Sequence, residues 1–324
     1  MLSLKSSHYA MATEFELLIY GERETYLQSV SEAVFEEISR LEAQLSFYNP
    51  DSDISDLNRH AASAPVTVEP RLFHLLRKAK ELSEATGGAF DPTVAPLMRC
   101  WGFVGASGSM PTAEAIEEAR RLVGMHHVHL DAGAYTVALD TEGVQLDLGA
   151  IGKGYAIECA VELLLEYEIE AALLHGGTST AYALGHPPDA DAWTIAIQRP
   201  FDSTAGRYLT QMSLRDEALS VSAPHGKWFA SEGRRYGHVI DPRTGYPAGS
   251  ALLAALVTAS ATKSDALSTA LLTLGPEGLA QIGNLLPDAR ALVATSPQSD
   301  HSLDPTAEIC VSTWGIPEVA QRGS

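Results

Sequence analysis

The chain has 324 residues, of which 45% are hydrophobic, and a formal net charge of −19. This length and composition are sufficient for one large core or two lobes. The acidic balance argues against the basic surface that nucleic-acid binding requires, and it disfavours binding to an anionic membrane. We therefore expect neither a nucleic acid nor a membrane as a partner.

The three cysteines, Cys100, Cys159 and Cys310, lie far apart and include no CxxC pair. An odd, dispersed set predicts reduced, buried thiols rather than a disulfide framework. The N-terminal residues lead directly into polar sequence, and no apolar run resembles a signal peptide or a membrane span. The sequence thus predicts a cytoplasmic protein.

Hydrophobic periodicity and turn residues predict helices and strands in mixed order. In chain order we expect a strand at 14–20, helices at 29–45, 70–86 and 111–122, strands at 128–130, 136–139 and 144–148, a helix at 153–167, strands at 171–174, 193–198 and 252–258, and a helix at 264–274. The order lacks the regular alternation of a doubly wound sheet. It predicts an α+β fold with mixed sheets and helices in two interleaved lobes around a cleft.

The segment 237–245 combines a histidine, a carboxylate, an arginine and a hydroxyl within nine residues. Two β-branched residues between His238 and Asp241 predict a short strand, which runs into a turn begun by Pro242. A histidine at the end of a strand can transfer a proton near neutral pH. His238 is therefore a candidate acid or base.

Residues 147–155 contain three glycines in a GxxGxG order between a predicted strand and a predicted helix. Such a turn lets backbone groups approach a ligand closely. The start of the following helix suits an anion, and Lys153 adds a positive charge. The run matches neither the Walker A motif nor the GxGxxG fingerprint, so an ordinary tight turn is the alternative.

Asp265 and Thr269 are four residues apart on a predicted helix and therefore share one face. A carboxylate and a hydroxyl on one face can supply two oxygen ligands to a hard cation such as Mg²⁺. The alternative is that Asp265 stabilises the start of its helix through its charge.

Three further segments have both a ligand-binding and a structural interpretation. Phe90 could stack on a flat ring and Asp91 could accept hydrogen bonds from a ring N–H or a ribose hydroxyl, or the pair could follow a helix cap as core residues. The glycines at 176–177 could cradle phosphate or form a turn. His127 and His129 would share one strand face as metal ligands, although no third ligand is evident nearby.

Taken in order, these stretches resemble the FAD:protein FMN transferase family of the ApbE type. The resemblance begins at residues 11–13, continues through 46–55, 86–94, 147–156, 176–177 and 238–247, and ends at 265–275. It implies a single domain over residues 1–324, an α+β fold, and FAD in a central cleft. It also implies Mg²⁺ on the pyrophosphate and transfer of FMN to a threonine hydroxyl of a target flavoprotein, with release of AMP.

The resemblance also assigns roles to individual residues of this chain. His238 would be catalytic and would accept the proton of the attacking hydroxyl. Mg²⁺ would be bound by the Ala150 backbone carbonyl, Asp265 and Thr269, so that Asp265→Ala would abolish turnover and leave the fold intact. The residues that would line the FAD site are Met11, Tyr48, Ala89, Phe90, Asp91, Asp147, Lys153 and Val239.

Several positions depart from the family's usual residues without touching His238 or the proposed metal ligands. Alanine replaces a glycine at position 12, threonine replaces an aspartate at 178, valine and alanine flank Ser222 in place of threonine and glycine, and serine replaces an alanine at 264.

Two other functions would use the same residues. A Mg²⁺-dependent FAD pyrophosphatase would use water as the nucleophile and release FMN and AMP. A non-catalytic protein would bind or deliver FAD without transfer. Release of AMP separates both enzymes from the binding protein, and covalent flavin on an acceptor separates the transferase from the pyrophosphatase.

Overall fold

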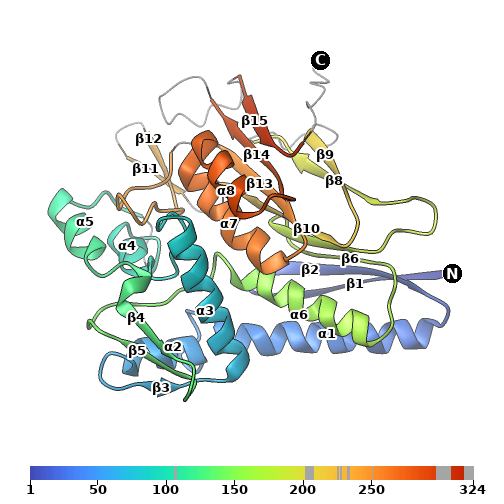
Figure 1. The fold of residues 1–324 in the computed structure, drawn as a ribbon, viewed down its shortest axis with the longest axis horizontal. Helices are drawn as coiled ribbons and strands as arrows, with labels where there is room; N and C mark the ends of the chain where they lie inside the picture. The colour runs from blue at the N-terminus through green and yellow to red at the C-terminus, as the bar shows by residue number, and fades with distance from the viewer. Residues whose placement is uncertain are drawn as a thin grey trace.

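The computed structural model describes residues 1–105, 108–200, 208–224, 226, 228–231, 234–249, 251–296 and 308–316. Its centre is an eight-stranded sheet with the order β1-β2-β6-β7-β10-β13-β14-β15, in which all neighbours are antiparallel (Figure 1). The strands are β1 (Leu2–Ala10), β2 (Thr13–Gly21), β6 (Ala172–Gly176), β7 (Thr180–Leu184), β10 (Glu217–Ser222), β13 (Leu253–Thr258), β14 (Arg290–Thr295) and β15 (Cys310–Trp314).

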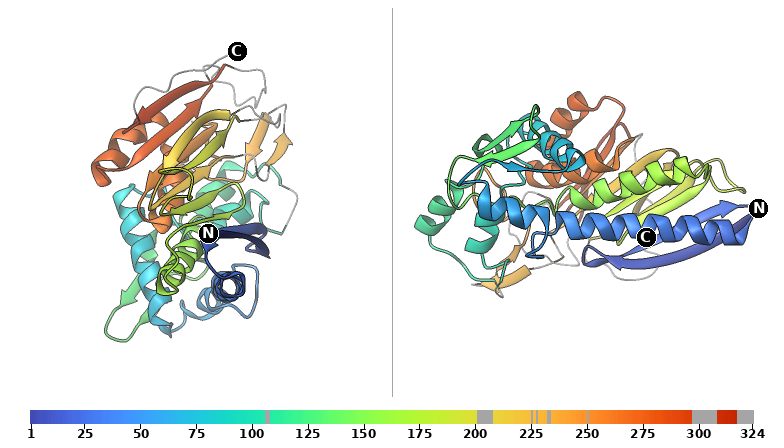
Figure 2. Two further views of the ribbon diagram at one scale, coloured as in Figure 1. Left: turned by 90° about the vertical axis from the view of Figure 1, so that its right-hand side faces the viewer. Right: turned by 90° about the horizontal axis from the view of Figure 1, so that it is seen from below.

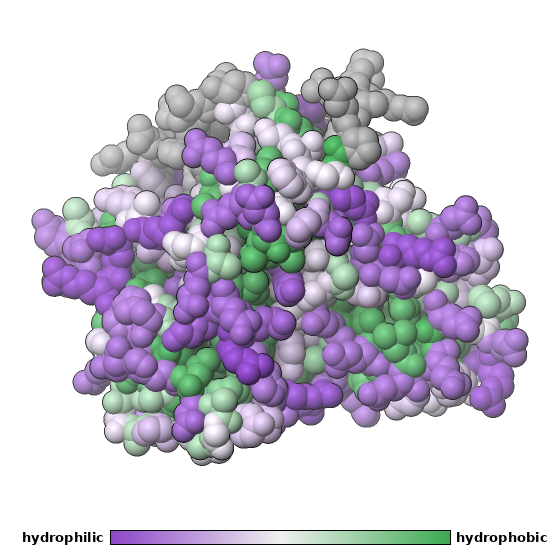
Figure 3. Space-filling model, in the orientation of Figure 1, coloured by the Kyte–Doolittle hydropathy of each residue, from purple (hydrophilic) through white to green (hydrophobic). Residues whose placement is uncertain are grey.

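Helices cover one face of this sheet, and hydrophilic side chains cover most of the outer surface that they present (Figures 1, 2 and 3). These helices are α1 (Glu24–Leu45), α6 (Gly152–Glu166), α7 (Ala261–Leu274) and α8 (Gly278–Leu285), with the short η2 (Gly275–Glu277) between the last two. Because side chains alternate across a strand, Phe15, Leu17 and Ile19 of β2 all face α1 and α6. The hairpin of β8 (Trp193–Gln198) and β9 (Tyr208–Leu214) covers the opposite face.

The chain leaves the sheet twice to build a second, smaller part. The first excursion contains α2 (Asp53–His60), β3 (Val66–Thr67), α3 (Pro70–Ala85), α4 (Ala95–Cys100), α5 (Ala113–Arg120), η1 (Met125–His127), β4 (Val128–Asp131) and β5 (Thr136–Leu139). The second excursion, between β10 and β13, forms the hairpin of β11 (Trp228–Ser231) and β12 (Arg234–Gly237). The two parts are therefore interleaved in sequence, as the mixed order of elements predicts.

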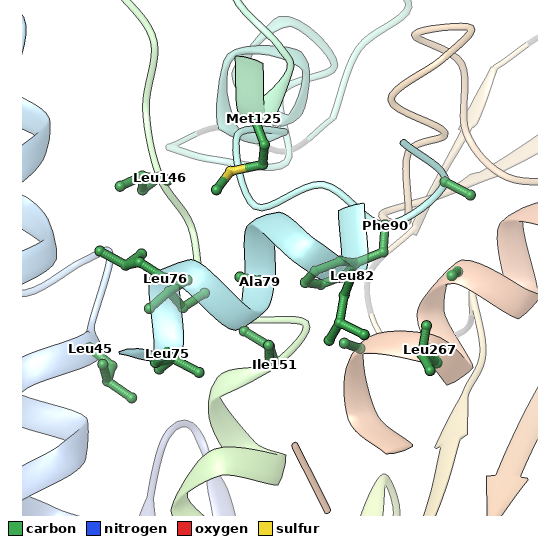
Figure 4. Close-up of a cluster of buried hydrophobic side chains, with 14 of the residues drawn as sticks. Leu45, Leu75, Leu76, Ala79, Leu82, Phe90, Met125, Leu146, Ile151 and Leu267 are labelled. Carbon is green, nitrogen blue, oxygen red and sulfur yellow. The ribbon is translucent and has the colours of Figure 1, made fainter. Parts of the chain in front are cut away.

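One hydrophobic core joins the two parts of the fold. Leu75, Leu76 and Leu82 of α3 pack in the same cluster as Leu45 of α1 and Leu267 of α7 (Figure 4). The periodicity of α3 predicts this apolar face, because residues three and four apart lie on one side of a helix. The shared core fixes the loops of the smaller part against the helical layer of the larger part.

Most of the predicted elements are confirmed within a few residues, and two predicted strands are wrong. Residues 144–148 are extended but form no ladder, because the Asn58 side chain bonds both the N–H of Leu146, at 2.7 Å, and its carbonyl, at 2.9 Å. Residues 238–241 follow β12 and make only an isolated bridge between Ile240 and Pro247. In both segments the backbone hydrogen bonds go to partners that local sequence does not reveal.

The three thiols are all free, but their burial differs from the expectation. Cys159 is buried, Cys100 is half-buried and Cys310 is exposed, so burial of all three thiols was a wrong prediction. Burial raises the pKa of the Cys159 thiol to about 11, which makes it a poor nucleophile at neutral pH.

No helix in the described ranges is long and apolar enough to cross a membrane.

Met11 and Ala12 form a two-residue turn between β1 and β2, since Ala10 pairs directly with Thr13. Their φ angles are 49° and 58°, and a tight turn with both residues in this left-handed region is the type that matches strand twist. Glycine adopts this region without strain, whereas the Cβ of alanine comes too close to the backbone and raises the conformational energy. The alanine at position 12 is therefore a local source of strain.

We predict that Ala12→Gly raises the free energy of unfolding by about 0.5–1 kcal/mol, because the relief of left-handed strain exceeds the added entropy of the unfolded chain. Urea denaturation of the ligand-free protein measures this change. The control is Ala62→Gly, at an exposed alanine outside the left-handed region, which should lower stability instead. Equal effects of the two substitutions would contradict the strain at Ala12.

Candidate functional site

The carboxylate of Asp265, in the second turn of α7, connects three elements of the fold. It is 4% exposed, and its Oδ2 accepts a hydrogen bond of 2.9 Å from the N–H of Gly154 in the first turn of α6. Its Oδ1 accepts a hydrogen bond of 3.2 Å from the Thr180 hydroxyl on β7. This aspartate therefore holds the starts of two helices and a central strand together.

Gly154 is required by the close packing of α6 on α7. A Cβ at this position would lie 2.2 Å from the carbonyl oxygen of Ala261 and 2.6 Å from the Cβ of Asp265. The last glycine of the GxxGxG run thus allows helix contact, and its N–H is directed to Asp265 rather than to a ligand. The structural interpretation of this run is confirmed at Gly154.

Hydroxyl groups extend the Asp265 site along α7 and β10. The Thr269 hydroxyl lies 3.1 Å from that of Ser222, and the Ser222 hydroxyl lies 2.8 Å from that of Ser268. Asp265 and Thr269 contact the neighbouring strands β7 and β10, so they share one face of α7 as predicted. Sequence reasoning did not single out Ser222 as a site residue, although the alternation of serine with apolar residues in β10 was a usable signal.

This set of oxygen atoms fits a hard cation such as Mg²⁺. Each carboxylate oxygen of Asp265 receives one described hydrogen bond and has a second lone pair for a further partner. Ala150 lies in the turn immediately before α6, where its backbone carbonyl is a third oxygen type. No cluster of three or more His, Cys, Asp or Glu that could hold a metal occurs among the residues that the structure describes, so phosphate and water would complete the shell of Mg²⁺.

The loops at 89–93 and 147–153 lie against each other. The N–H of Asp147 donates to the carbonyl of Pro92 at 2.7 Å, and its Oδ1 accepts from the N–H of Gly149 at 2.8 Å. The Lys153 ammonium lies 3.4 Å from the carbonyl oxygen of Gly149, which keeps its positive charge at the start of α6. Two of the predicted FAD-lining segments are thus brought together with the start of that helix.

Tyr48 belongs to the same group of residues. Burial of its hydroxyl and the nearby Asp147 carboxylate raise the pKa of Tyr48. The residue as a whole is 64% exposed, and its ring makes an edge contact with Phe47 at a centroid distance of 5.4 Å. An exposed aromatic ring near a carboxylate suits a flat ligand that carries hydrogen-bond donors.

Asp91 differs from its predicted role, because its carboxylate is fully used within the protein. It is 7% exposed and accepts hydrogen bonds from the Ser83 hydroxyl at 3.0 Å, the Met125 N–H at 3.1 Å, and the N–H and hydroxyl of Thr93 at 2.9 and 2.5 Å. A carboxylate has about four lone-pair positions, so little capacity is left for a ligand. The expectation that Asp91 accepts from FAD directly is corrected, and the residue instead fixes its loop.

The ring of Phe90 is 2% exposed and lies beside Leu82 in the main core (Figure 4). The expectation that this ring stacks on a ligand was therefore wrong, and the core interpretation is confirmed. Ala89 is buried in the same cluster. Both residues are thus closed to a ligand in this structure, and their backbone N–H groups bond Thr86.

The segment from His238 to Gly245 is shaped by an internal ion pair. Arg243 donates from its backbone N–H, Nε and Nη2 to the two Asp241 oxygens at 2.8–2.9 Å, and this pairing raises the pKa of the guanidinium. The indole of the buried Trp101 donates to the Gly245 carbonyl at 2.8 Å. Asp241 thus fixes the conformation of the turn, and the half-buried His238 and Val239 immediately precede it.

The remaining two candidate segments have structural roles. Gly177 forms the turn of the β6–β7 hairpin, with a φ of 58° and its N–H bonded to the Glu14 carbonyl at 2.8 Å. His127 and His129 both contact the Asp140 carboxylate, at 2.6 and 3.3 Å. The bond to His127 is the main reason why the pKa of Asp140 falls to about 2. These histidines form part of no metal cluster in the described chain.

Comparison with known proteins identifies the family. The sequence model of the ApbE family matches residues 11–293. The chain belongs to the ApbE family. It is 34% identical over 259 residues to a FAD:protein FMN transferase of Treponema pallidum, with 76% of this chain and 71% of the relative covered. A FAD:protein FMN transferase of Klebsiella pneumoniae is 30% identical, with 77% of each chain covered.

Solved structures of ApbE proteins share this fold. The ApbE protein of Thermotoga maritima superposes with a TM-score of 0.83 at 28% identity, covering 90% of this chain and 94% of that one. The apo flavinyl transferase ApbE of Pseudomonas stutzeri gives a TM-score of 0.81 at 26% identity, covering 96% and 94%. These matches confirm the predicted α+β fold and the expectation of an enzyme of the ApbE type.

In this ApbE-family chain, Asp265→Ala should lower the free energy of unfolding by about 1–3 kcal/mol, because a buried N–H and a buried hydroxyl lose their acceptor. The buried hydrogen bonds of Asp265 thus predict a loss of stability in a variant that the sequence alone expects to keep its fold. Asp265→Asn is the control, since its amide can still accept from Gly154 and donate to Thr180. Chemical denaturation in the absence of metal measures both variants, and equal stability of the two would contradict the bridging role of the carboxylate.

Proposed function

We propose that this protein transfers FMN from FAD to a threonine hydroxyl of an acceptor flavoprotein, with release of AMP and with a requirement for Mg²⁺. The observation that carries the proposal is the oxygen set of Asp265, Thr269 and Ser222 beside the start of α6. That helix start has a partial positive charge, and Lys153 adds a full one. A pyrophosphate bridged to a hard cation suits this combination of charges, even though the protein as a whole is acidic.

In the proposed reaction the threonine oxygen forms a bond to the phosphorus of the FMN half. The bond from that phosphorus to the bridging oxygen breaks, and AMP leaves with that oxygen. His238 accepts the proton of the hydroxyl. Such transfers depend mainly on position and charge neutralisation, and bound Mg²⁺ would supply most of the neutralisation.

The flavin-bearing ligand would lie where the loops at 89–93 and 147–153 meet. In this proposal Tyr48 offers its ring and Asp147 and Lys153 offer side chains, while Ala89 and Phe90 support the loop from the core. Met11 and Val239 pack at the edge of the same core and complete the apolar lining. Asp91 acts by holding its loop in place.

Incubation with FAD, Mg²⁺ and an FMN-binding domain that normally carries flavin on threonine tests the proposal. Mass spectrometry of the domain should show the gain of one FMN, with an equal amount of AMP in solution. AMP without a mass gain would instead support the pyrophosphatase with water as nucleophile. Neither product would support a binding or delivery protein.

His238→Ala should lower the rate of FMN transfer by about 10²–10⁴-fold, the range that general-base catalysis contributes. FAD affinity, measured by flavin fluorescence, should stay within about twofold, because the proton transfer makes no ground-state contribution to binding. His60→Ala is the control, since His60 is an exposed histidine on α2. A large loss of FAD affinity in His238→Ala would make this residue a ligand contact.

Chelation by EDTA should abolish transfer, and added Mg²⁺ should restore it, because the pyrophosphate charge is otherwise not neutralised. Thr269→Val should need a higher Mg²⁺ concentration for half-maximal rate, since it lacks the hydroxyl that faces Ser222. Thr269→Ser keeps the hydroxyl and should resemble the original protein. Full activity in EDTA would show that the oxygen set serves another purpose.

A further inference from the structure

The β11–β12 hairpin has one packed face and one open face. It forms a two-stranded sheet of its own, outside the eight-stranded sheet (Figure 1). Phe229 and Tyr236 face inward and stack at a centroid distance of 5.4 Å, and Tyr236 lies 5.5 Å from the ring of Trp101. A free two-stranded hairpin is marginally stable in water, so this aromatic packing holds it in place.

The open face presents a tryptophan and an arginine to solvent. Trp228 is 47% exposed, and the guanidinium carbon of the exposed Arg235 lies 4.5 Å from the centroid of its ring. Trp228 and Arg235 point outward because side chains alternate along a strand, and their neighbours Phe229 and Tyr236 point inward. Stacking orders the guanidinium plane and leaves its N–H groups for a partner.

The first and last residues of the hairpin, which pair with each other, lie near His238. Trp228 pairs with Gly237, the residue immediately before His238, and paired residues of antiparallel strands have Cα atoms about 5 Å apart. Gly226, two residues before Trp228, lies against the imidazole, since a Cβ there would be 3.1 Å from His238 Cε1. The hairpin therefore forms one border of the space around His238.

We propose that the open face of the β11–β12 hairpin, formed by Trp228 and Arg235, is the docking surface for the acceptor protein. This inference rests on the proposed transferase function, in which a protein hydroxyl must reach His238. Tryptophan and arginine are the residue types that most often dominate protein interfaces. In the proposed function FAD would lie against Val239 and the loops that meet at Asp147, and not on the open face of the hairpin.

The charge of Arg235 indicates the chemistry of the docked segment. The protein carries a net charge of −19, so an acidic partner is repelled by most of its surface. In the described part of the chain Arg235 forms no ion pair with an acidic side chain, and its contact is with the Trp228 ring. A carboxylate near the modified threonine of the acceptor would find a local counter-charge and two N–H donors here.

The test compares Trp228→Ala and Arg235→Gln with the original protein, using the threonine-bearing FMN-binding domain as acceptor. Each variant should raise the KM for the acceptor by about tenfold or more, as expected for a dominant interface residue. The kcat at saturating acceptor and the affinity for FAD should remain within about twofold, because neither residue contacts the reacting atoms. Added salt should reduce the difference in acceptor KM between the original protein and Arg235→Gln, since screening removes an attraction that only the original protein has.

Leu165→Ala and Arg215→Gln are matched controls, because Leu165 and Arg215 are exposed residues on α6 and before β10, outside the hairpin. Thermal unfolding of every variant separates loss of docking from loss of folding. An unchanged acceptor KM would overturn the proposal, and so would a matching loss of FAD affinity, which would make the hairpin part of the nucleotide site.

Direct binding of the acceptor domain to the FAD-loaded protein, measured by biolayer interferometry, keeps the two proposals distinguishable. If the original protein binds the domain but transfers no FMN, the transferase function fails while the docking surface is still measured through the two variants. If the original protein shows no binding, or if all variants bind equally, the docking surface is contradicted. Size-exclusion chromatography excludes a second copy of this chain as the occupant if the protein stays monomeric.

Discussion

The buried carboxylate of Asp265 is the interaction on which the rest of the site depends. A charged group in the interior is tolerated only when donors surround it, and here the donors come from α6 and β7. Their fixed geometry sets the distance between two helix starts and the central sheet. The hydroxyls of Thr269 and Ser222 lie along the same face of α7, 3.1 Å from each other. In the proposed function the Asp265 side chain would serve both the packing of the fold and the binding of the metal.

Two other aspartates act in the same way on the surrounding loops. Asp91 uses its four hydrogen bonds to hold the loop that abuts Asp147, and Asp241 uses its ion pair with Arg243 to hold the turn after His238. All of these bonds lie within the protein and need no ligand. A site whose loops are held by such bonds loses less entropy on binding, which would favour the placement of the ligands in the proposed function.

The sequence predicted the elements that have a clear local hydrophobic pattern. It failed where hydrogen bonds from residues far along the chain determine the backbone structure. The apolar periodicity of α1, α3 and α6 located those helices to within a few residues, except for the start of α1. Strand β1 was missed, because its alternation involves polar residues at the edge of the sheet. The segment at 144–148 was predicted as a strand, but the side chain of Asn58 takes the place of a neighbouring strand.

The candidate site shows the same division. Spacing correctly placed Asp265 and Thr269 on one helix face, and the order of motifs indicated the family. The sequence did not reveal that Phe90 is a core residue or that Gly154 serves the contact between α6 and α7. The sequence of a motif is the same whether its aromatic residue or glycine binds a ligand or packs in the core. Only the surrounding packing distinguishes the two roles.

In the proposed function Asp265 combines its structural hydrogen bonds with metal binding. Anomalous diffraction from crystals grown with Mn²⁺ and FAD can test this dual role, because Mn²⁺ replaces Mg²⁺ at oxygen sites and can be located by its own signal. We expect a Mn²⁺ peak in contact with the Asp265 carboxylate and the Thr269 hydroxyl, about 2.0–2.3 Å from each oxygen. A peak at His127, His129 and Asp140 instead, or none near α7, would contradict it.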